Sequence, residues 1–165
     1  MDLQLPDVLA ANADYQKTGA HAAPRTPQPS RHLVVLTCMD ARLDLFRALG
    51  LEVGHAHILR NAGGRASDDA IRSLVVSTHL LGTREILVIH HTNCGLEGMT
   101  DDDVAQKTGV GGIDYLAFDD VEESVRTDVD AIRAFGKLPE GTVVWGAVYD
   151  VNDGSVRVVA EPDVD

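Results

Sequence analysis

The sequence contains few cysteines, few aromatic side chains and few positive charges. Its 165 residues include only 2 cysteines, which excludes a scaffold held together by disulfides, and aromatic residues make up only 4%. The 26 aspartate and glutamate residues outnumber the 14 lysine and arginine residues, so the formal net charge is −12. Nucleic acid and anionic membranes are therefore poor partners for this chain.

Long apolar runs are also missing from the sequence. No run approaches the roughly 20 residues that a transmembrane helix requires, so we expect no membrane partner. Residues 1–10 lack the basic start and the apolar stretch of a signal peptide, and we therefore expect a cytoplasmic protein. In a reducing compartment, two thiols indicate metal ligands or catalytic groups rather than a disulfide.

Short apolar runs alternate with helical patterns after residue 32. The runs predict strands at 33–37, 56–60, 86–90, 143–149 and 156–160. Helices are predicted at 41–49, between Ser67 and Gly82, and across 121–135, whereas 98–112 predicts a loop with at most one short helix. The turn signal at 152–154 makes the last strand antiparallel. We expect an α/β fold: a doubly wound, mainly parallel sheet of four strands plus one antiparallel edge strand, flanked by helices.

The first 31 residues differ in character from the rest of the chain. Residues 1–20 carry a weak helical pattern, and residues 21–31, with Pro24, Pro27 and Pro29, predict an extended connector. This segment is either a disordered leader or an arm that packs on a partner subunit. We assign residues 1–31 to an N-terminal helical arm with a Pro-rich connector and residues 32–165 to a single α/β domain.

Both cysteines follow predicted strands. Cys38 comes after the first strand, and His91 and Cys94 come after the third. In an open α/β sheet, ligands bind beyond the carboxyl ends of the strands, where the strand order reverses. If the first and third strands are neighbours, two thiolates and one imidazole meet there, and this donor set selects zinc. The alternatives are a buried structural thiol pair or a Cys38–Cys94 disulfide. His90 is a rival ligand that we interpret as a packed neighbour.

Asp40 and Arg42 follow Cys38 on the same turn. Three protein ligands leave the fourth position of zinc free for water, which is typical of a catalytic site. A carboxylate paired with a guanidinium can accept a proton or a hydrogen bond beside the metal. The alternative interpretation is an ordinary salt bridge at the start of a helix.

Three segments of the sequence resemble motifs of the β-carbonic anhydrase family. Residues 38–42 (CMDAR) resemble its C-x-D-x-R motif, residues 91–94 (HTNC) its H-x-x-C motif, and residues 60–63 (RNAG) the segment between them. The order agrees over residues 32–150, and the chain looks most like the short prokaryotic members. The glutamine and tyrosine that line the substrate pocket of the plant-type members have no evident counterpart.

The resemblance implies a zinc-binding catalytic domain. It implies one Zn²⁺ per chain on Cys38, His91 and Cys94, with Asp40 and Arg42 as the catalytic pair. The implied activity is reversible hydration of carbon dioxide to bicarbonate by zinc-bound hydroxide. It further implies a homodimer, or a tetramer made of two such dimers, with the site near the dimer interface.

Two other functions remain open at this point. The same site could hydrolyse carbonyl sulfide or carbon disulfide, which resemble carbon dioxide in shape. A non-catalytic zinc site or a thiol redox sensor is the third interpretation. Arg60, Gly63 and Gly64 could line the substrate channel or the dimer interface. We interpret them instead as a strand-to-helix turn, in which glycine supplies unusual backbone angles.

Overall fold

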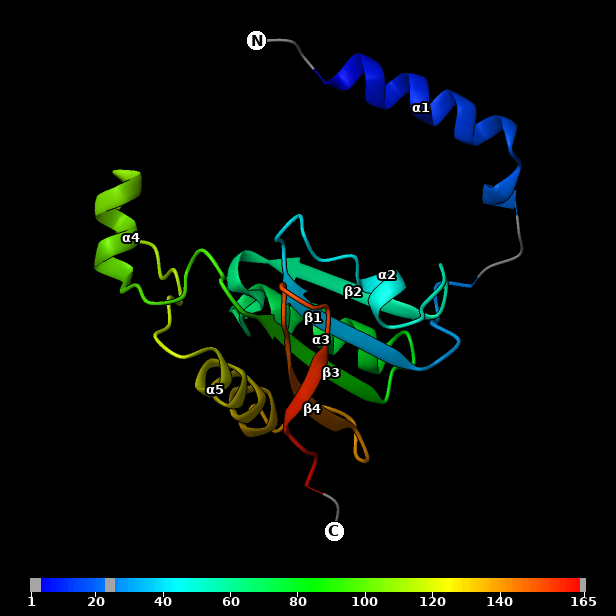
Figure 1. The fold of residues 1–165 in the computed structure, drawn as a ribbon. Coiled ribbons are helices and arrows are strands. Elements are labelled where there is room, and N and C mark those ends of the chain that lie inside the picture. The colour runs from blue at the N-terminus through cyan, green and yellow to red at the C-terminus, as the bar shows by residue number, and fades with distance from the viewer. Residues whose placement is uncertain (1–3, 23–25, 164–165) are drawn as a thin grey trace.

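A five-stranded sheet forms the centre of the molecule (Figure 1). The computed structural model describes residues 4–22 and 26–163. The strand order is β2-β1-β3-β4-β5. The strands are β1 (Leu33–Cys38), β2 (Ala56–Asn61), β3 (Glu85–His91), β4 (Val143–Tyr149) and β5 (Val156–Ala160). The first four pair in parallel and β5 pairs antiparallel with β4, which confirms the predicted fold.

The strand order reverses at β1. The chain passes from β1 to β2 on one side and then crosses to β3 on the other, so β1 pairs with both. Thr37 lies opposite Ile89 in this register, and Cys38 lies opposite Asn61. The carboxyl ends of β1 and β3 therefore lie side by side at the point where the strand order reverses. In this class of sheet, ligands bind at such a point.

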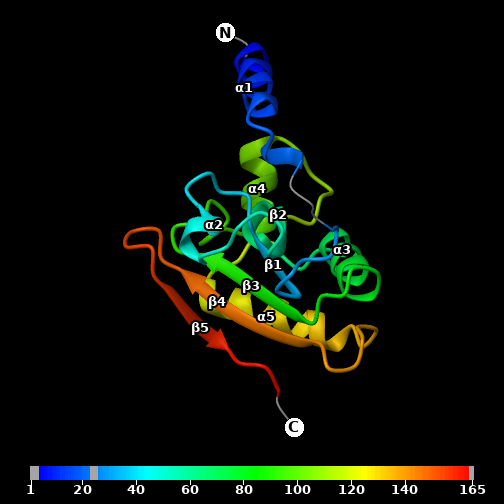
Figure 2. The same ribbon diagram turned by 90° about the vertical axis from the view of Figure 1, so that its right-hand side faces the viewer.

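The two long helices of the domain pack on one face of the sheet. α3 (Asp68–His79) and α5 (Val121–Ala134) bury a cluster with β1, β3 and β4, and Figure 2 shows α5 running along β3 and β4. This cluster includes Leu36, Leu74, Ile86, Val88, Val129 and Ile132. The short helix α2 (Leu45–Ala48) lies in the connection toward the other face, where Val35, Ile89 and Ala147 are buried.

Of two expected helices between the strands, one has the wrong bounds and one is confirmed. The helix expected at 41–49 is limited to α2. The side chain of Asp44 accepts the backbone N–H of Arg47 and so caps the N-terminus of this helix. The residues before it form a separate turn, in which the Asp40 carboxylate accepts the backbone N–H of Arg42. The segment 98–112, expected to be a loop with at most one short helix, contains the eight-residue helix α4 (Asp101–Thr108), which confirms that expectation. A reciprocal capping box between Thr100 and Asp103 stabilises its first turn.

The N-terminal arm is a helix that stands apart from the sheet (Figure 1). α1 (Leu5–Lys17) is followed by the short turns η1 (Ala20–Ala22), and no residue of α1 is buried among the described residues. Residues 1–3 and 23–25, the latter including Pro24 of the predicted connector, lie outside the described residues. Across the described part of the chain, every helix is too short or too polar to cross a membrane.

Candidate metal centre

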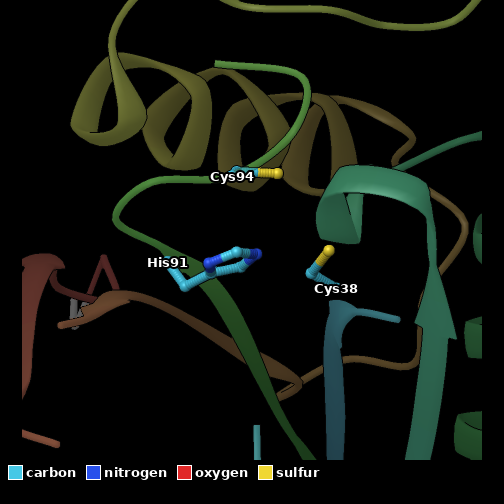
Figure 3. Close-up of side chains that lie close together, drawn as sticks. All are labelled: Cys38, His91 and Cys94. Carbon is cyan, nitrogen blue, oxygen red and sulfur yellow. The ribbon is translucent and has the colours of Figure 1, made fainter. Parts of the chain in front are cut away.

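Cys38, His91 and Cys94 meet at the carboxyl ends of β1 and β3. Cys38 is the last residue of β1 and His91 the last of β3, while Cys94 follows on a turn in which Asn93 has a φ of 56°. One ligand atom from each of the three lies within 4.8 Å of the others, and all three residues are buried (Figure 3). The fold therefore brings together three side chains that come from two separate segments of the sequence.

The ring of His91 is oriented by the backbone. Its Nδ1 lies 3.0 Å from the carbonyl oxygen of Thr92, and because a carbonyl only accepts, Nδ1 carries the proton. The other nitrogen, Nε2, is buried and has no hydrogen-bond partner among the described residues. A bare imidazole nitrogen facing two thiols fits a zinc ion, which prefers tetrahedral sulfur and nitrogen ligands.

Without an ion between them, the two thiols have pKa values that are shifted in opposite directions. The neighbouring Cys94 thiol lowers the pKa of Cys38, burial opposes this, and the backbone N–H groups of Asp40 and Gly63 lower it further. The proximity of the Cys38 thiolate and burial together raise the pKa of Cys94. The opposite shifts favour one proton shared by the two sulfur atoms, and a metal cation would displace that proton.

Asp40 and Arg42 form a bidentate ion pair at the edge of this site. Oδ1 of Asp40 accepts from Nε of Arg42 at 2.9 Å, and Oδ2 accepts from Nη2 at 2.7 Å. These hydrogen bonds, with that from the Arg42 N–H, hold the pKa of Asp40 far below its usual range. Oδ2 also lies 3.8 Å from Nε2 of His91. The carboxylate is thus ionised beside the donor atoms.

Arg42 also joins the two loops that supply the site. Its Nη2 donates to the carbonyl oxygen of Asn93 at 2.9 Å, which ties the turn after β1 to the turn before Cys94. The position of the Asp40 carboxylate is therefore fixed relative to both cysteines.

Arg60 has a role that the sequence interpretation missed. Its guanidinium donates to the carbonyl oxygens of Cys38 at 2.9 Å and Asp40 at 2.6 Å, and it lies 3.4 Å from that of Leu43. Arg60 thereby fixes the turn that carries Cys38, Asp40 and Arg42. The only available signal was its position at the end of a strand in the RNAG segment, which does not reveal the direction of the side chain.

His90 points away from the donor atoms. Its Nδ1 lies 2.7 Å from Oγ of Ser124 and its Nε2 lies 3.1 Å from Oδ2 of Asp128, both on α5. Successive side chains of a strand face opposite sides of the sheet, so His90 and His91 cannot both face the cysteines. His90 is packed beneath the site, as its place one residue earlier in the strand had indicated.

Comparison with known proteins places the chain in a family. The sequence profile described as "Carbonic anhydrase" matches residues 33–117. Beta-carbonic anhydrase 1 of Mycobacterium tuberculosis is 40% identical over 158 residues, covering 93% of this chain and 96% of the relative. This chain belongs to the β-carbonic anhydrase family.

Structural comparison agrees with membership of the β-carbonic anhydrases. The crystal structure of the carbonic anhydrase from Streptococcus mutans matches with a TM-score of 0.86 at 42% identity, covering 97% of this chain and 99% of the other. This chain also has relatives that are named for a different activity. A carbon disulfide hydrolase of Acidithiobacillus thiooxidans is 31% identical over 153 residues, covering 78% of this chain and 77% of the relative.

Proposed function

We propose that this β-carbonic anhydrase catalyses the reversible hydration of carbon dioxide to bicarbonate with one Zn²⁺ per chain, held by Cys38, His91 and Cys94. The observation that supports it most is the group of two thiols and one bare imidazole nitrogen within 4.8 Å. An ionised carboxylate held by Arg42 stands beside that group. Membership of the family supports the same activity.

Each side chain of the site has a distinct task in this proposal. Zinc, when bound, is a Lewis acid that makes hydroxide available near neutral pH. Asp40 is the hydrogen-bond acceptor that orients the attacking oxygen, and Arg42 keeps the carboxylate ionised and aimed. Leu43, Leu45 and Phe118 pack around the cysteines and exclude bulk water from the sulfur atoms.

Hydrolysis of carbon disulfide or carbonyl sulfide is the second candidate function. Its support is the identity with carbon disulfide hydrolases, which reaches 53% over 76 residues of a relative from Saccharolobus solfataricus. The same zinc ligands and the same Asp40–Arg42 pair serve either substrate, because both reactions begin with attack on the central carbon. Product assays therefore have to separate them.

We also propose a homodimer in which residues 1–31 form the exchanged arm. Leu5, Val8 and Leu9 of α1 are 63%, 59% and 58% exposed, so this helix has an apolar side that its own domain leaves in water. An apolar groove of about 490 Å³ runs between α2, β2 and α3, and it includes the exposed Phe46 and Val76. The arm of a second copy is the occupant that these two surfaces favour.

The chemistry of the thiols favours the cytoplasm. Both cysteines are free in the structure and are proposed as zinc ligands, which requires them to remain reduced. Residues 32–165 form the proposed zinc-binding catalytic domain, and a tetramer would pair two of the arm-exchanged dimers.

Metal analysis and stopped-flow hydration of carbon dioxide test the main proposal. We expect the wild type to carry one zinc per chain and to accelerate hydration, with a rate that rises from neutral to alkaline pH. Cys94→Ser should lose zinc and activity together. Hydrogen sulfide release from carbon disulfide, assayed in parallel, identifies the second candidate. A wild type that binds no stoichiometric zinc contradicts the proposal.

Light scattering on the full chain and on a chain that begins at residue 26 tests the assembly. We expect a dimer for the full chain and a shift toward the monomer for the shortened one. Equal masses per particle for both would contradict the exchanged arm.

A further inference from the structure

Four polar side chains are buried beneath the metal centre, on the side of β3 opposite His91. We call Arg65, His90, Ser124 and Asp128 the buried polar cluster. The side chains of Arg65, His90 and Asp128 are only 8%, 0% and 6% exposed. Burying charge without a partner is very unfavourable, so such a cluster is retained only when its members satisfy one another.

Every member of the buried polar cluster is hydrogen-bonded. Nε of Arg65 donates to Oδ2 of Asp128 at 2.8 Å, and its Nη2 donates to Oδ1 at 3.1 Å. Nε2 of His90 lies 3.1 Å from Oδ2 of Asp128, and Nδ1 lies 2.7 Å from Oγ of Ser124. These contacts join β3, α5 and the segment that follows the Gly63–Gly64 turn.

The order Ser124, His90, Asp128 is that of a hydrolytic triad, but the structure excludes this use. Oγ of Ser124 is buried on α5 and donates to the carbonyl oxygen of Val121 at 2.8 Å. A nucleophile has to reach substrate and hand its proton to the histidine. This hydroxyl does neither, so the cluster has another role.

One connection from the cluster to the metal centre runs through the Gly63–Gly64 turn. Nε2 of His90 lies 3.3 Å from the carbonyl oxygen of Gly64. This residue touches the strand end that carries Cys38, since a Cβ built on Gly64 would lie 2.8 Å from the backbone nitrogen of Cys38.

A second connection runs through Phe118. The guanidinium of Arg65 lies 5.4 Å from the centre of the Phe118 ring, and the ring of His90 stacks on it at 5.8 Å. Arg65 also donates from Nη1 to the carbonyl oxygen of Leu116, which lies two residues before Phe118 in the chain. Phe118 packs in the same apolar cluster as Cys38 and Cys94. The position of the Phe118 ring beside the cysteines therefore depends on Arg65.

We propose that Arg65 and Asp128, acting through His90, are positioning residues for the zinc ligands. Their bidentate pair fixes the Gly63–Gly64 turn against Cys38 and fixes Phe118 against both sulfur atoms. The inference rests on the proposed zinc site and adds to it two residues that contact neither zinc nor substrate. Partners of metal ligands commonly tune metal affinity in this way.

Zinc competition against a chelator tests the role of Asp128. In Asp128→Asn we expect zinc affinity to fall roughly 10- to 100-fold, the range typical for such outer partners of metal ligands. The visible spectrum of the cobalt-substituted protein should change as well, since it reports the ligand geometry directly. Asp130→Asn is the matched control, because Asp130 is on the same helix with a side chain 76% exposed. It should retain wild-type affinity and spectrum.

The double variant Arg65→Gln/Asp128→Asn separates positioning from folding. Asp128→Asn leaves the Arg65 charge buried without its partner, whereas the double variant removes both charges and should fold more readily. Thermal unfolding of the metal-free proteins monitors this. If the pair positions the ligands, zinc affinity remains low in the double variant and the cobalt spectrum remains altered. The double variant also decides the matter if Asp128→Asn alone does not fold.

Two results distinguish this inference from the proposed function. If the folded double variant has the zinc affinity and the cobalt spectrum of the wild type, the positioning role is overturned, while the proposed zinc site remains supported. Absence of stoichiometric zinc from the wild type would overturn the proposed function itself.

Discussion

Arg42 shows how one side chain can matter more for orientation than for stability. Its side chain is 51% exposed, and ion pairs at such positions contribute little to the free energy of unfolding. Yet it donates to both oxygens of Asp40 and to the carbonyl oxygen of Asn93. The pair should therefore be judged by catalysis and not by protein stability.

Asp40→Asn should separate catalysis from metal binding. The amide keeps the size of the carboxylate but loses its charge and one acceptor. We expect kcat for carbon dioxide hydration to fall by about 10²- to 10⁴-fold, the usual contribution of a positioned acid or base. Zinc content should be unchanged. Asp163→Asn, at a side chain 85% exposed, is the control and should match the wild type in both measurements. Loss of zinc from Asp40→Asn would point to a structural role instead.

Gly64→Ala compared with Gly82→Ala should isolate the effect of close packing against Cys38. Both glycines have similar positive φ angles, 76° and 73°, so an added Cβ strains both backbones alike. Only at Gly64 would it collide with the backbone of Thr37 and Cys38, whereas at Gly82 nothing lies within 4 Å.

Urea unfolding and zinc titration check this comparison. We expect Gly82→Ala to lower the free energy of unfolding by about 1–2 kcal/mol and to bind zinc normally. Gly64→Ala should lose more stability and also lose zinc affinity. Equal effects at the two positions would mean that the approach of Gly64 to β1 is not important for the site.

At the scale of elements, the sequence predicted what depends on local pattern. The strand runs at 33–37 and 86–90 are apolar and short, and the reversal of strand order then brings Cys38 beside His91. Helix α4 was harder to predict, because its eight residues are polar and bury only Val104. A periodic apolar face, the main signal of a helix, is nearly absent there.

The side chains that support the site could not be predicted in the same way. Arg65 and Asp128 are far apart in sequence, and each looks like an ordinary charged residue until α5 packs on the sheet. Arg60 likewise required knowledge of how the turn after β1 folds back on β2. Local patterns indicated the proposed zinc ligands, whereas their supporting contacts depend on tertiary structure.

Asp101 should anchor the segment after α4. Its carboxylate accepts the N–H of Tyr115 at 2.7 Å and the N–H of Ala117 at 2.9 Å. In Asp101→Asn, we expect the amide protons of Tyr115 and Ala117 to exchange faster with solvent, because an amide is a weaker acceptor than a carboxylate. Asp102→Asn, one residue away in the same helix, should leave both exchange rates unchanged. Equal exchange in the two variants would contradict the anchoring role.

At the scale of the whole molecule, the excess of acidic groups makes the response to acid informative. Most carboxylates are exposed and repel one another at neutral pH, so protonating them relieves repulsion. Asp128 behaves in the opposite way. Burial raises its pKa, but the hydrogen bonds from His90 and Arg65 lower it by more, so the net shift is downward from 3.8.

The contribution of Asp128 to stability should therefore disappear in acid. A carboxyl group whose pKa is lower in the folded protein stabilises that state above its ordinary pKa, and this stabilisation is lost as the pH falls through the folded value. We expect Asp128→Asn to be destabilised by about 3–5 kcal/mol at neutral pH, and the difference from wild type to narrow below pH 3.8. Urea unfolding at several pH values measures it. A difference that stays constant with pH would contradict this assignment.

The proposed ligands come from the ends of two different strands, and this has a consequence for the cell. An ion bound there would cross-link segments that are distant along the chain, so the folded state would gain free energy by mass action. At a free zinc concentration about 100 times the dissociation constant, this gain is about 2.7 kcal/mol. Supply of the metal would then control how long the protein survives as well as whether it is active. In zinc-starved cells, the amount of the protein should decline along with its activity.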